Sequence, residues 1–352
     1  MTKNRAQFYG PNGELFHPTL KFPEDHNAEE DAEVLHKAMK GWGTDENRII
    51  EILGHRDVYQ RIQIRDQYKA SFGQDLIQRI SGETSGHFRS LLKMLLTETA
   101  EVNARALYKA IKGGGTDEDT IIQVLCTSTN NEIMEIKEAY QSVLISYGIN
   151  DPTRTLESDV EGDLSGCFKN LVIALLQAQR EEADFEDVQK IPTRGLSSVV
   201  NMSQVEKDVD TIWNAGEGQL GTDESTFIKI VANRSVWHIQ AIAKKFEEKY
   251  EKSLIDSLES ETSGDFERAL VLTVRSCLNR PKTYSDLLYK AMKGLGTDDG
   301  TLMRIIVTRC EIDLKSICKE FECETNSTVE EWIRDETSGD YRSLLLVLIG
   351  VE

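Results

Sequence analysis

Proline is scarce in this chain, and its cysteines form no closely spaced pair. The sequence has 6 prolines and 6 cysteines in 352 residues, and no two cysteines stand in a C-x-x-C arrangement. The cysteine spacing therefore argues against a structural zinc site. Reduced thiols in a cytoplasmic protein are the expectation.

Long apolar runs are absent as well. The run at residues 344–349, among the longest, is far shorter than the roughly 18–20 residues that span a bilayer. Residues 1–27 also lack the apolar core of a secretory signal. We therefore expect neither a membrane-spanning helix nor a cleaved leader.

Positive charge is in deficit. The chain has 41 Lys and Arg against 60 Asp and Glu, a formal net charge of -19. Affinity for nucleic acid comes mostly from cations that neutralise phosphates, so we expect no nucleic-acid partner. Anionic lipid headgroups are repelled for the same reason. Such a chain can bind an anionic surface only with something positive in between, and a divalent cation is the obvious candidate.

What the sequence does contain is one pattern in four copies. The string G-x-G-T-D, with one extra residue in the third copy, occurs at residues 41–45, 113–117, 218–223 and 294–298. A second string, an acidic residue followed by x-S-G, begins at Glu83, Asp163, Glu261 and Glu336. The acid follows the loop threonine by 39 residues in three copies and by 47 in the second. Repeat two therefore carries an insertion.

These registers divide the chain into repeats and connections. We predict an N-terminal segment 1–27, repeat one 28–98, repeat two 99–180 with an insertion at about 145–155, an extended linker 181–202, repeat three 203–279 and repeat four 280–352. Apolar residues at i, i+3 and i+4 spacing, as in 32–39 and 284–292, predict helices. The fold class is therefore all-α, with four homologous repeats of five helices each.

Smaller features refine this prediction. Thr44, followed by two acids, is expected to cap the second helix of repeat one. Prolines are expected outside the helices of the repeats. Arg56, Arg234 and Arg309, twelve residues after a loop threonine, are expected to make hydrogen bonds within their own repeats.

The chemistry of the loops follows from their residue types. A Gly-x-Gly turn can point several backbone carbonyls at one spot, because glycine tolerates positive φ. Calcium prefers six to eight oxygen ligands and favours carboxylates. One acid brought to each loop supplies the missing charge, and water or a lipid phosphate can complete the shell. Calcium and lipid binding would then be reciprocally coupled.

From about residue 20 to the end, this combination resembles the annexin family. The resemblance implies a curved all-α disc with calcium loops on its convex face. It implies calcium-dependent binding to acidic phospholipid membranes, as a peripheral scaffold. The implied calcium ligands are the carbonyls of Met39, Gly41 and Gly43 with the Glu83 carboxylate, of Ile111, Gly113 and Gly115 with Asp163, of Gly216, Gln219 and Gly221 with Glu261, and of Met292, Gly294 and Gly296 with Glu336. A secondary site would use the Thr44 carbonyl and Glu46.

Three apolar residues occupy the loop tips. Trp42 lies between two loop glycines, and Leu220 and Leu295 take its position in the third and fourth loops. A core role for Trp42 stays open. An aromatic residue at a membrane-facing tip favours interfacial anchoring instead, and we expect all three to contact membrane.

Alternatives to a calcium-dependent scaffold remain. One is an enzyme, such as a lipid hydrolase, but no nucleophile–base arrangement recurs, and we expect none. Another is an ion channel, against which the lack of a bilayer span argues. Nucleotide binding has no G-x-x-x-x-G-K-[ST] motif, and an EF-hand pattern is absent too. We expect a cytoplasmic, peripherally membrane-associated protein, with non-classical export to the cell surface left open.

Two further expectations concern the linker and the cysteines. A short helix near 183–190 is expected to dock Phe185 and Val188 as an apolar stripe, in a linker that crosses the concave side. Cys126 and Cys277 are expected to be buried. Cys167 is expected to be accessible, which leaves open a disulfide-linked homodimer or an inert, reduced thiol. Protein partners are unknown.

Overall fold

The computed structural model describes residues 9–10, 13–41 and 43–351. Across these residues the regular structure is helical, apart from an isolated antiparallel bridge between Tyr9 and Leu15. The predicted all-α class is confirmed. The described residues form two compact units: unit 1 holds those up to residue 15 with 103–283, and unit 2 holds 16–102 with 284–351.

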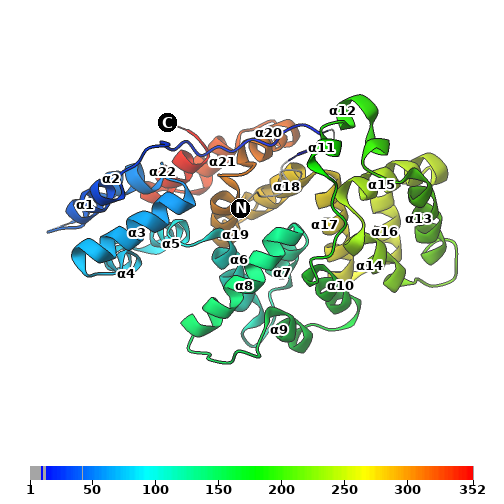
Figure 1. Ribbon diagram of the computed structural model, residues 1–352, viewed down its shortest axis with the longest axis horizontal. Helices are drawn as coiled ribbons and strands as arrows, with labels where there is room; N and C mark the ends of the chain where they lie inside the picture. Colours follow the sequence, from blue (N-terminus) through cyan, green and yellow to red (C-terminus); the bar gives the residue numbers. More distant parts are fainter. Residues whose placement is uncertain (1–8, 11–12, 42, 352) are drawn as a thin grey trace. The chain divides into compact units, whose positions relative to one another are not determined.

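Each repeat contains five helices, as predicted (Figure 1). Repeat one has α1 (Ala28–Ala38), α2 (Glu46–Leu53), α3 (Val58–Phe72), α4 (Leu76–Glu83) and α5 (Gly86–Leu95). Repeat two has α6 (Thr99–Ile111), α7 (Glu118–Leu125), α8 (Asn130–Ser146), α9 (Leu156–Asp163) and α10 (Gly166–Leu176). Repeat three has α13 (Met202–Ala215), α14 (Glu224–Asn233), α15 (Val236–Tyr250), α16 (Leu254–Glu261) and α17 (Gly264–Leu278). Repeat four has α18 (Arg280–Met292), α19 (Asp299–Arg309), α20 (Leu314–Thr325), α21 (Val329–Glu336) and α22 (Gly339–Leu348).

The second helix of each repeat is capped by the loop aspartate, so the prediction that Thr44 caps α2 is wrong. In repeat one, the Asp45 carboxylate accepts the Arg48 N–H at 3.1 Å. The other three loops repeat this contact. An aspartate satisfies the free N–H groups of the first turn as well as a threonine does, and its charge suits the helix N-terminus. The Thr44 hydroxyl is thereby left for another contact.

Proline placement also needs one correction. Pro281 lies inside α18, because that helix begins at Arg280, earlier than the sequence pattern indicated. It stands in the first turn, where the missing N–H has no partner in the helix anyway. The helix therefore tolerates it.

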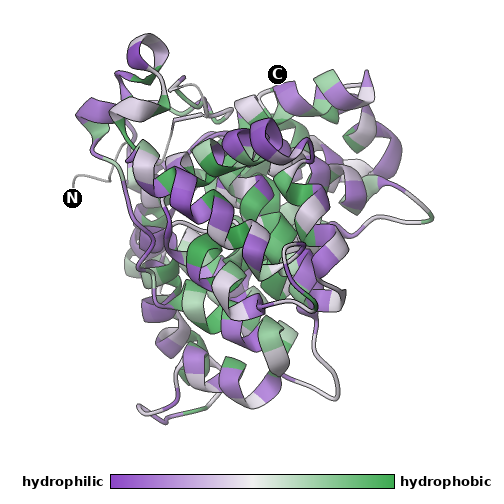
Figure 2. Ribbon diagram, turned by 90° about the vertical axis from the view of Figure 1, so that its right-hand side faces the viewer, coloured by the Kyte–Doolittle hydropathy of each residue, from purple (hydrophilic) through white to green (hydrophobic). Residues whose placement is uncertain are grey.

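Each unit buries its own apolar core. In unit 1, α10 packs on α14 and α17, and Leu171 and Leu270 are fully buried there. Figure 2 shows hydrophobic residues gathered on the inner sides of these helices. In unit 2, α1 packs on α3, α2 on α22, and α5 on α19. Arg61 is 1% exposed there and donates to the Leu53 carbonyl at 2.9 Å, and it pairs with Glu311 at 3.3 Å.

The three predicted arginine contacts are confirmed. Arg56 binds Asp31 through two hydrogen bonds of 2.7 and 2.8 Å. Arg234 binds Asp208, and Arg309 binds Asp313, in the same two-pronged way. Each pair lies within a single repeat. The Arg56 and Arg234 pairs also tie the end of the second helix to the first helix, the two helices that flank the loop.

The linker folds against unit 1. It contains α11 (Phe185–Val188), α12 (Ile191–Arg194) and a 3-10 turn, η2 (Leu196–Ser198). Val188 is fully buried beside Trp237, and the Phe185 ring meets the Tyr9 ring edge-on at 5.7 Å. The predicted short helix and its apolar stripe are therefore present, and α12 is an additional helix.

The insertion lies between α8 and α9, where the spacing placed it. Arg154 closes it by binding the Asp159 carboxylate at 2.7 Å, and the Tyr140 hydroxyl donates to the same carboxylate at 2.6 Å. Asp159 belongs to α9, the helix that ends at the loop acid Asp163. The insertion thus supports the helix that presents this acid. Within the described part of the chain, every helix is too short or too polar to cross a bilayer.

Candidate calcium loops

Four loops join the first and second helices of the repeats. We call them loop 1 (39–44), loop 2 (111–116), loop 3 (216–222) and loop 4 (292–297). Each is closed by a hydrogen bond from the N–H of its aspartate to the carbonyl of an alanine at the end of the preceding helix. In loop 1 this bond joins Asp45 to Ala38 at 2.9 Å, and in loop 3 it joins Asp223 to Ala215 at 2.7 Å. The extra residue of loop 3 is therefore accommodated inside the same closure.

Glycine is needed at these turns for its backbone conformation. Gly41 has φ of 108° and Gly294 has φ of 128°, values that a side chain disfavours. Among the described residues, no atom would collide with a Cβ added at either position, so the requirement is one of backbone angle. The positive φ turns the backbone out of the helical path, as a loop that directs its carbonyls at an ion requires. In loop 3 the Gly216 carbonyl accepts the Gln219 N–H at 3.0 Å.

The predicted acid meets its loop in all four repeats. The loop threonine hydroxyl donates to the acid's carboxylate: Thr44 to Glu83 at 3.2 Å, Thr116 to Asp163 at 2.7 Å, Thr222 to Glu261 at 3.0 Å and Thr297 to Glu336 at 2.9 Å. These bonds span the sequence separations found above. This contact also explains why the threonine does not cap the second helix.

Two loops show that the acid lies beside the predicted carbonyl residues. In loop 3, a Cβ placed on Gly216 would come within 3.2 Å of the Glu261 carboxyl carbon. In loop 1, the Arg79 guanidinium binds both the Met39 carbonyl and the Glu83 carboxylate, the latter at 2.9 Å. A single cationic group thus touches a carbonyl and a carboxylate that the family resemblance assigns to one calcium ion.

The residues present fit calcium. Each loop offers neutral backbone oxygens and one carboxylate, a hard-oxygen set of the kind calcium prefers. Among the residues that the structure describes, no three His, Cys, Asp or Glu side chains cluster to bind a metal. This agrees with a calcium site built mainly from backbone carbonyls, because such a site needs only one acidic side chain in each loop.

The loop tips differ in what they expose. Leu220 and Leu295 are more than 100% exposed relative to a reference residue, the highest values among the large hydrophobic side chains described. Loop 2 has Gly114 at this position. Trp42 lies outside the described residues. The secondary pair, Thr44 and Glu46, is half-buried at the start of α2.

The cysteines follow the predictions in part. Cys126 and Cys277 are buried, as expected, and burial raises the pKa of Cys126 to about 12. Cys167 is half-buried rather than open, and burial followed by the charge of Glu224 raises its pKa. Cys323 on α20 is the exposed thiol, which the sequence did not single out.

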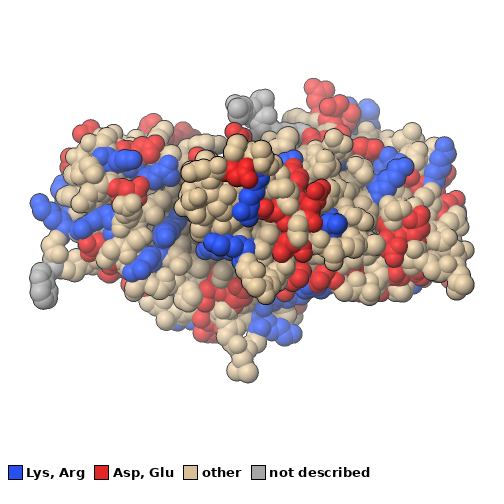
Figure 3. Space-filling model, turned by 90° about the horizontal axis from the view of Figure 1, so that it is seen from below, with Lys and Arg blue, Asp and Glu red and all other residues tan. Residues whose placement is uncertain are grey.

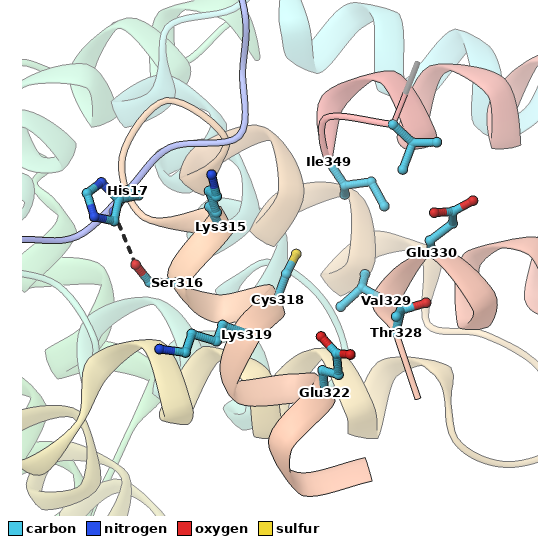
Figure 4. A pocket seen from close by; sticks show the side chains of 11 residues that line it. His17, Lys315, Ser316, Cys318, Lys319, Glu322, Thr328, Val329, Glu330 and Ile349 are labelled. Carbon is cyan, nitrogen blue, oxygen red and sulfur yellow. Dashed lines mark hydrogen bonds between the residues drawn. The ribbon is translucent and has the colours of Figure 1, made fainter. Parts of the chain in front are cut away.

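A pocket in unit 2 lies apart from the loops. It has a volume of about 400 Å³ and is bordered by α20, the start of α21 and the C-terminal residues (Figure 4). His17 and Lys319 lie on one side, Val329 and Ile349 on the other, and Cys318 between them. No residue of loop 4 and no loop acid lines it. It is therefore separate from the candidate calcium site.

Arg79 is the site residue that the sequence analysis missed. The residue four positions before each loop acid is Arg79, Asp159, Ser257 or Trp332. Alignment of the four repeats would have shown that only repeat one carries a cation there. The helical spacing i, i+4 then places this cation on the same face as Glu83.

The chain matches known proteins over its whole length. The family model described as Annexin matches four segments, residues 30–95, 102–175, 207–272 and 284–348. A protein named Annexin A13 from Schistosoma japonicum is 68% identical over 352 residues, covering 100% of this chain and 99% of the relative. Human Annexin A13 is 40% identical over 333 residues, covering 95% and 98%. The crystal structure of calcium-bound annexin (Sm)1 has a TM-score of 0.90 and 33% identity, covering 100% of this chain and 98% of that one.

Proposed function

This chain belongs to the annexin family, and we propose that it is a peripheral membrane scaffold whose four loops hold calcium against acidic phospholipid. Calcium-dependent phospholipid binding is the activity for which the family is known. The observation that carries the proposal for this chain is the meeting of loop threonine and acid in all four repeats.

The residues divide the work of binding. The carbonyls of each loop and its acid, Glu83, Asp163, Glu261 or Glu336, would hold the ion. Bound calcium would supply positive charge and open coordination positions for lipid phosphate oxygens. The threonine hydroxyl orients each carboxylate through one oxygen. The second oxygen is left available in repeats two to four, whereas in repeat one Arg79 binds it. Leu220 and Leu295, which are fully exposed in the free protein, would insert among the lipids.

The surface charge supports a bridging cation. Figure 3 shows that the face in view carries both acidic and basic side chains. The net charge of -19 repels an anionic membrane at long range. Direct lysine and arginine contacts are therefore a weaker explanation for membrane binding than ions held in the loops.

The test is sedimentation with phosphatidylserine vesicles. The chain should pellet with the vesicles at millimolar calcium and return to the supernatant when a chelator is added. Phosphatidylcholine vesicles serve as the control for surface charge. Pelleting that persists in chelator, or no pelleting at millimolar calcium, would contradict the proposal.

Three finer points belong to the same proposal. The protein acts by binding and not by catalysis. It works at membranes from the cytoplasm, with export to the cell surface as an alternative location. A homodimer linked through Cys167 is a further proposal, and it requires this half-buried thiol to be reached by its partner.

A further inference from the structure

Loop 1 differs from the other three loops in what faces its calcium ligands. The Arg79 guanidinium lies 2.9 Å from the Glu83 carboxylate and donates to the Met39 carbonyl. Both oxygens belong to the ligand set assigned to calcium. The guanidinium therefore satisfies, within the chain, the groups that would otherwise bind the ion.

The equivalent residues of the other repeats are directed elsewhere. Asp159 is held by Arg154 and Tyr140. Ser257 donates to the Glu217 side chain at 3.1 Å, and Trp332 packs its ring against Tyr289 at 5.3 Å. None of these three side chains is a cation. At this position, therefore, only repeat one has a cation that can compete with calcium.

We propose that Arg79 competes with calcium for loop 1, so that this loop fills at higher calcium concentrations than it would without the arginine. This inference rests on the proposed calcium-binding function. It assigns to Arg79 the role of setting the affinity of one loop.

The physical basis is electrostatic and geometric. Arginine stays charged at all physiological pH values, and its planar fork of donors matches a carboxylate together with a neighbouring carbonyl. Calcium binding must break these bonds and then place two like-charged cations close together. The affinity of loop 1 is therefore set by how easily the arginine moves away.

Solvent exposure allows the Arg79 side chain to move away from loop 1, whereas its hydrogen bonds oppose this movement. The Arg79 side chain is 32% exposed and Glu83 is 23% exposed, so solvent can receive the displaced guanidinium. Tyr68, which is fully buried, also hydrogen-bonds to Arg79. Burial raises the pKa of Tyr68, and the Arg79 charge opposes this rise. Arg79 is thus held by three oxygens in the absence of calcium.

Calorimetric calcium titration of the full chain without lipid tests the inference. Arg79→Gln should tighten one calcium site about three- to tenfold, the range expected when a partly exposed, charge-assisted contact stops competing. Arg79→Lys keeps the charge without the fork and should fall between wild type and Arg79→Gln. Arg334→Gln is the matched control, because it removes the same charge from an arginine that pairs with Glu330 rather than with a loop.

A second substitution assigns the effect to loop 1. Adding Glu83→Gln to Arg79→Gln should remove the tightened site. If Arg79→Gln binds calcium no more tightly than wild type while Glu83→Gln still loses a site, the inference fails and the proposed function stands. If Glu83→Gln leaves the titration unchanged in both backgrounds, loop 1 binds no calcium, and the proposed function fails there together with the inference.

Discussion

The exposed leucines at two loop tips allow a quantitative prediction about membrane insertion. Leu220 and Leu295 are fully exposed, so Leu→Ala removes no packing from the free protein. Each truncation removes three carbons, worth about 2 kcal/mol if the side chain is fully buried in lipid and about 1 kcal/mol if it is half buried. Each variant should therefore bind vesicles about 5- to 30-fold more weakly.

The two losses should multiply, because the leucines share no partner. Vesicle affinity is measured by co-sedimentation over a range of phosphatidylserine concentrations at fixed calcium. Met134→Ala is the matched control: Met134 is 53% exposed on α8 and belongs to no loop. The free energy of unfolding of each variant, measured by thermal denaturation, should stay within about 0.5 kcal/mol of the wild-type value, as for other exposed positions. A double variant that binds vesicles within twofold of wild type would refute insertion of the tips.

Three further predictions concern the body of the protein. Burial lowers the pKa of His238 although the Asp208 carboxylate lies 3.0 Å away, so the folded chain favours the neutral imidazole. The free energy of unfolding should therefore fall as the pH drops below about 6.5, the pKa of an unfolded histidine. In urea titrations at pH 5 and 7.5, His238→Gln should show a smaller fall than wild type. An equal slope in both proteins would contradict this. Val188→Asp places an unpaired charge in the buried contact between the linker and Trp237, and it should make the linker sensitive to limited proteolysis. Rapid cleavage of the wild-type linker would show instead that the linker is not docked. Under native conditions a maleimide should label Cys323 before Cys167, and the reverse order would contradict the exposure assigned to these thiols. A covalent dimer that survives Cys167→Ser on a non-reducing gel would show that Cys167 does not form the disulfide.

The repeat architecture and the acid of each loop could be predicted from the sequence. Four copies at a fixed register exclude coincidence, and a helical hairpin brings the two ends of a constant spacing together. The predicted meeting of Thr297 and Glu336, 39 residues apart, is found at 2.9 Å. The eight-residue difference in repeat two was assigned to an insertion because only that spacing changed, and the structure has it between α8 and α9.

Other features depend on choices that a linear pattern does not determine. Thr44 and Asp45 are both good capping residues, and the choice between them follows from the hydrogen bond of Thr44 to Glu83, which exists only in the folded repeat. α12 is four residues long and carries too little periodicity to be read from the sequence. The role of Arg79 depends on a side chain that reaches back across the loop, and only one repeat has it.

The most direct test of the account is the sign of a charge effect. Replacing Glu83, Asp163, Glu261 and Glu336 by their amides makes the protein four charges less negative. If the acids only repel lipid, the quadruple variant should bind phosphatidylserine vesicles more tightly than wild type. If they hold calcium, it should bind much more weakly in calcium-dependent sedimentation. We predict the weaker binding; equal or tighter binding at the same calcium concentration would contradict the account.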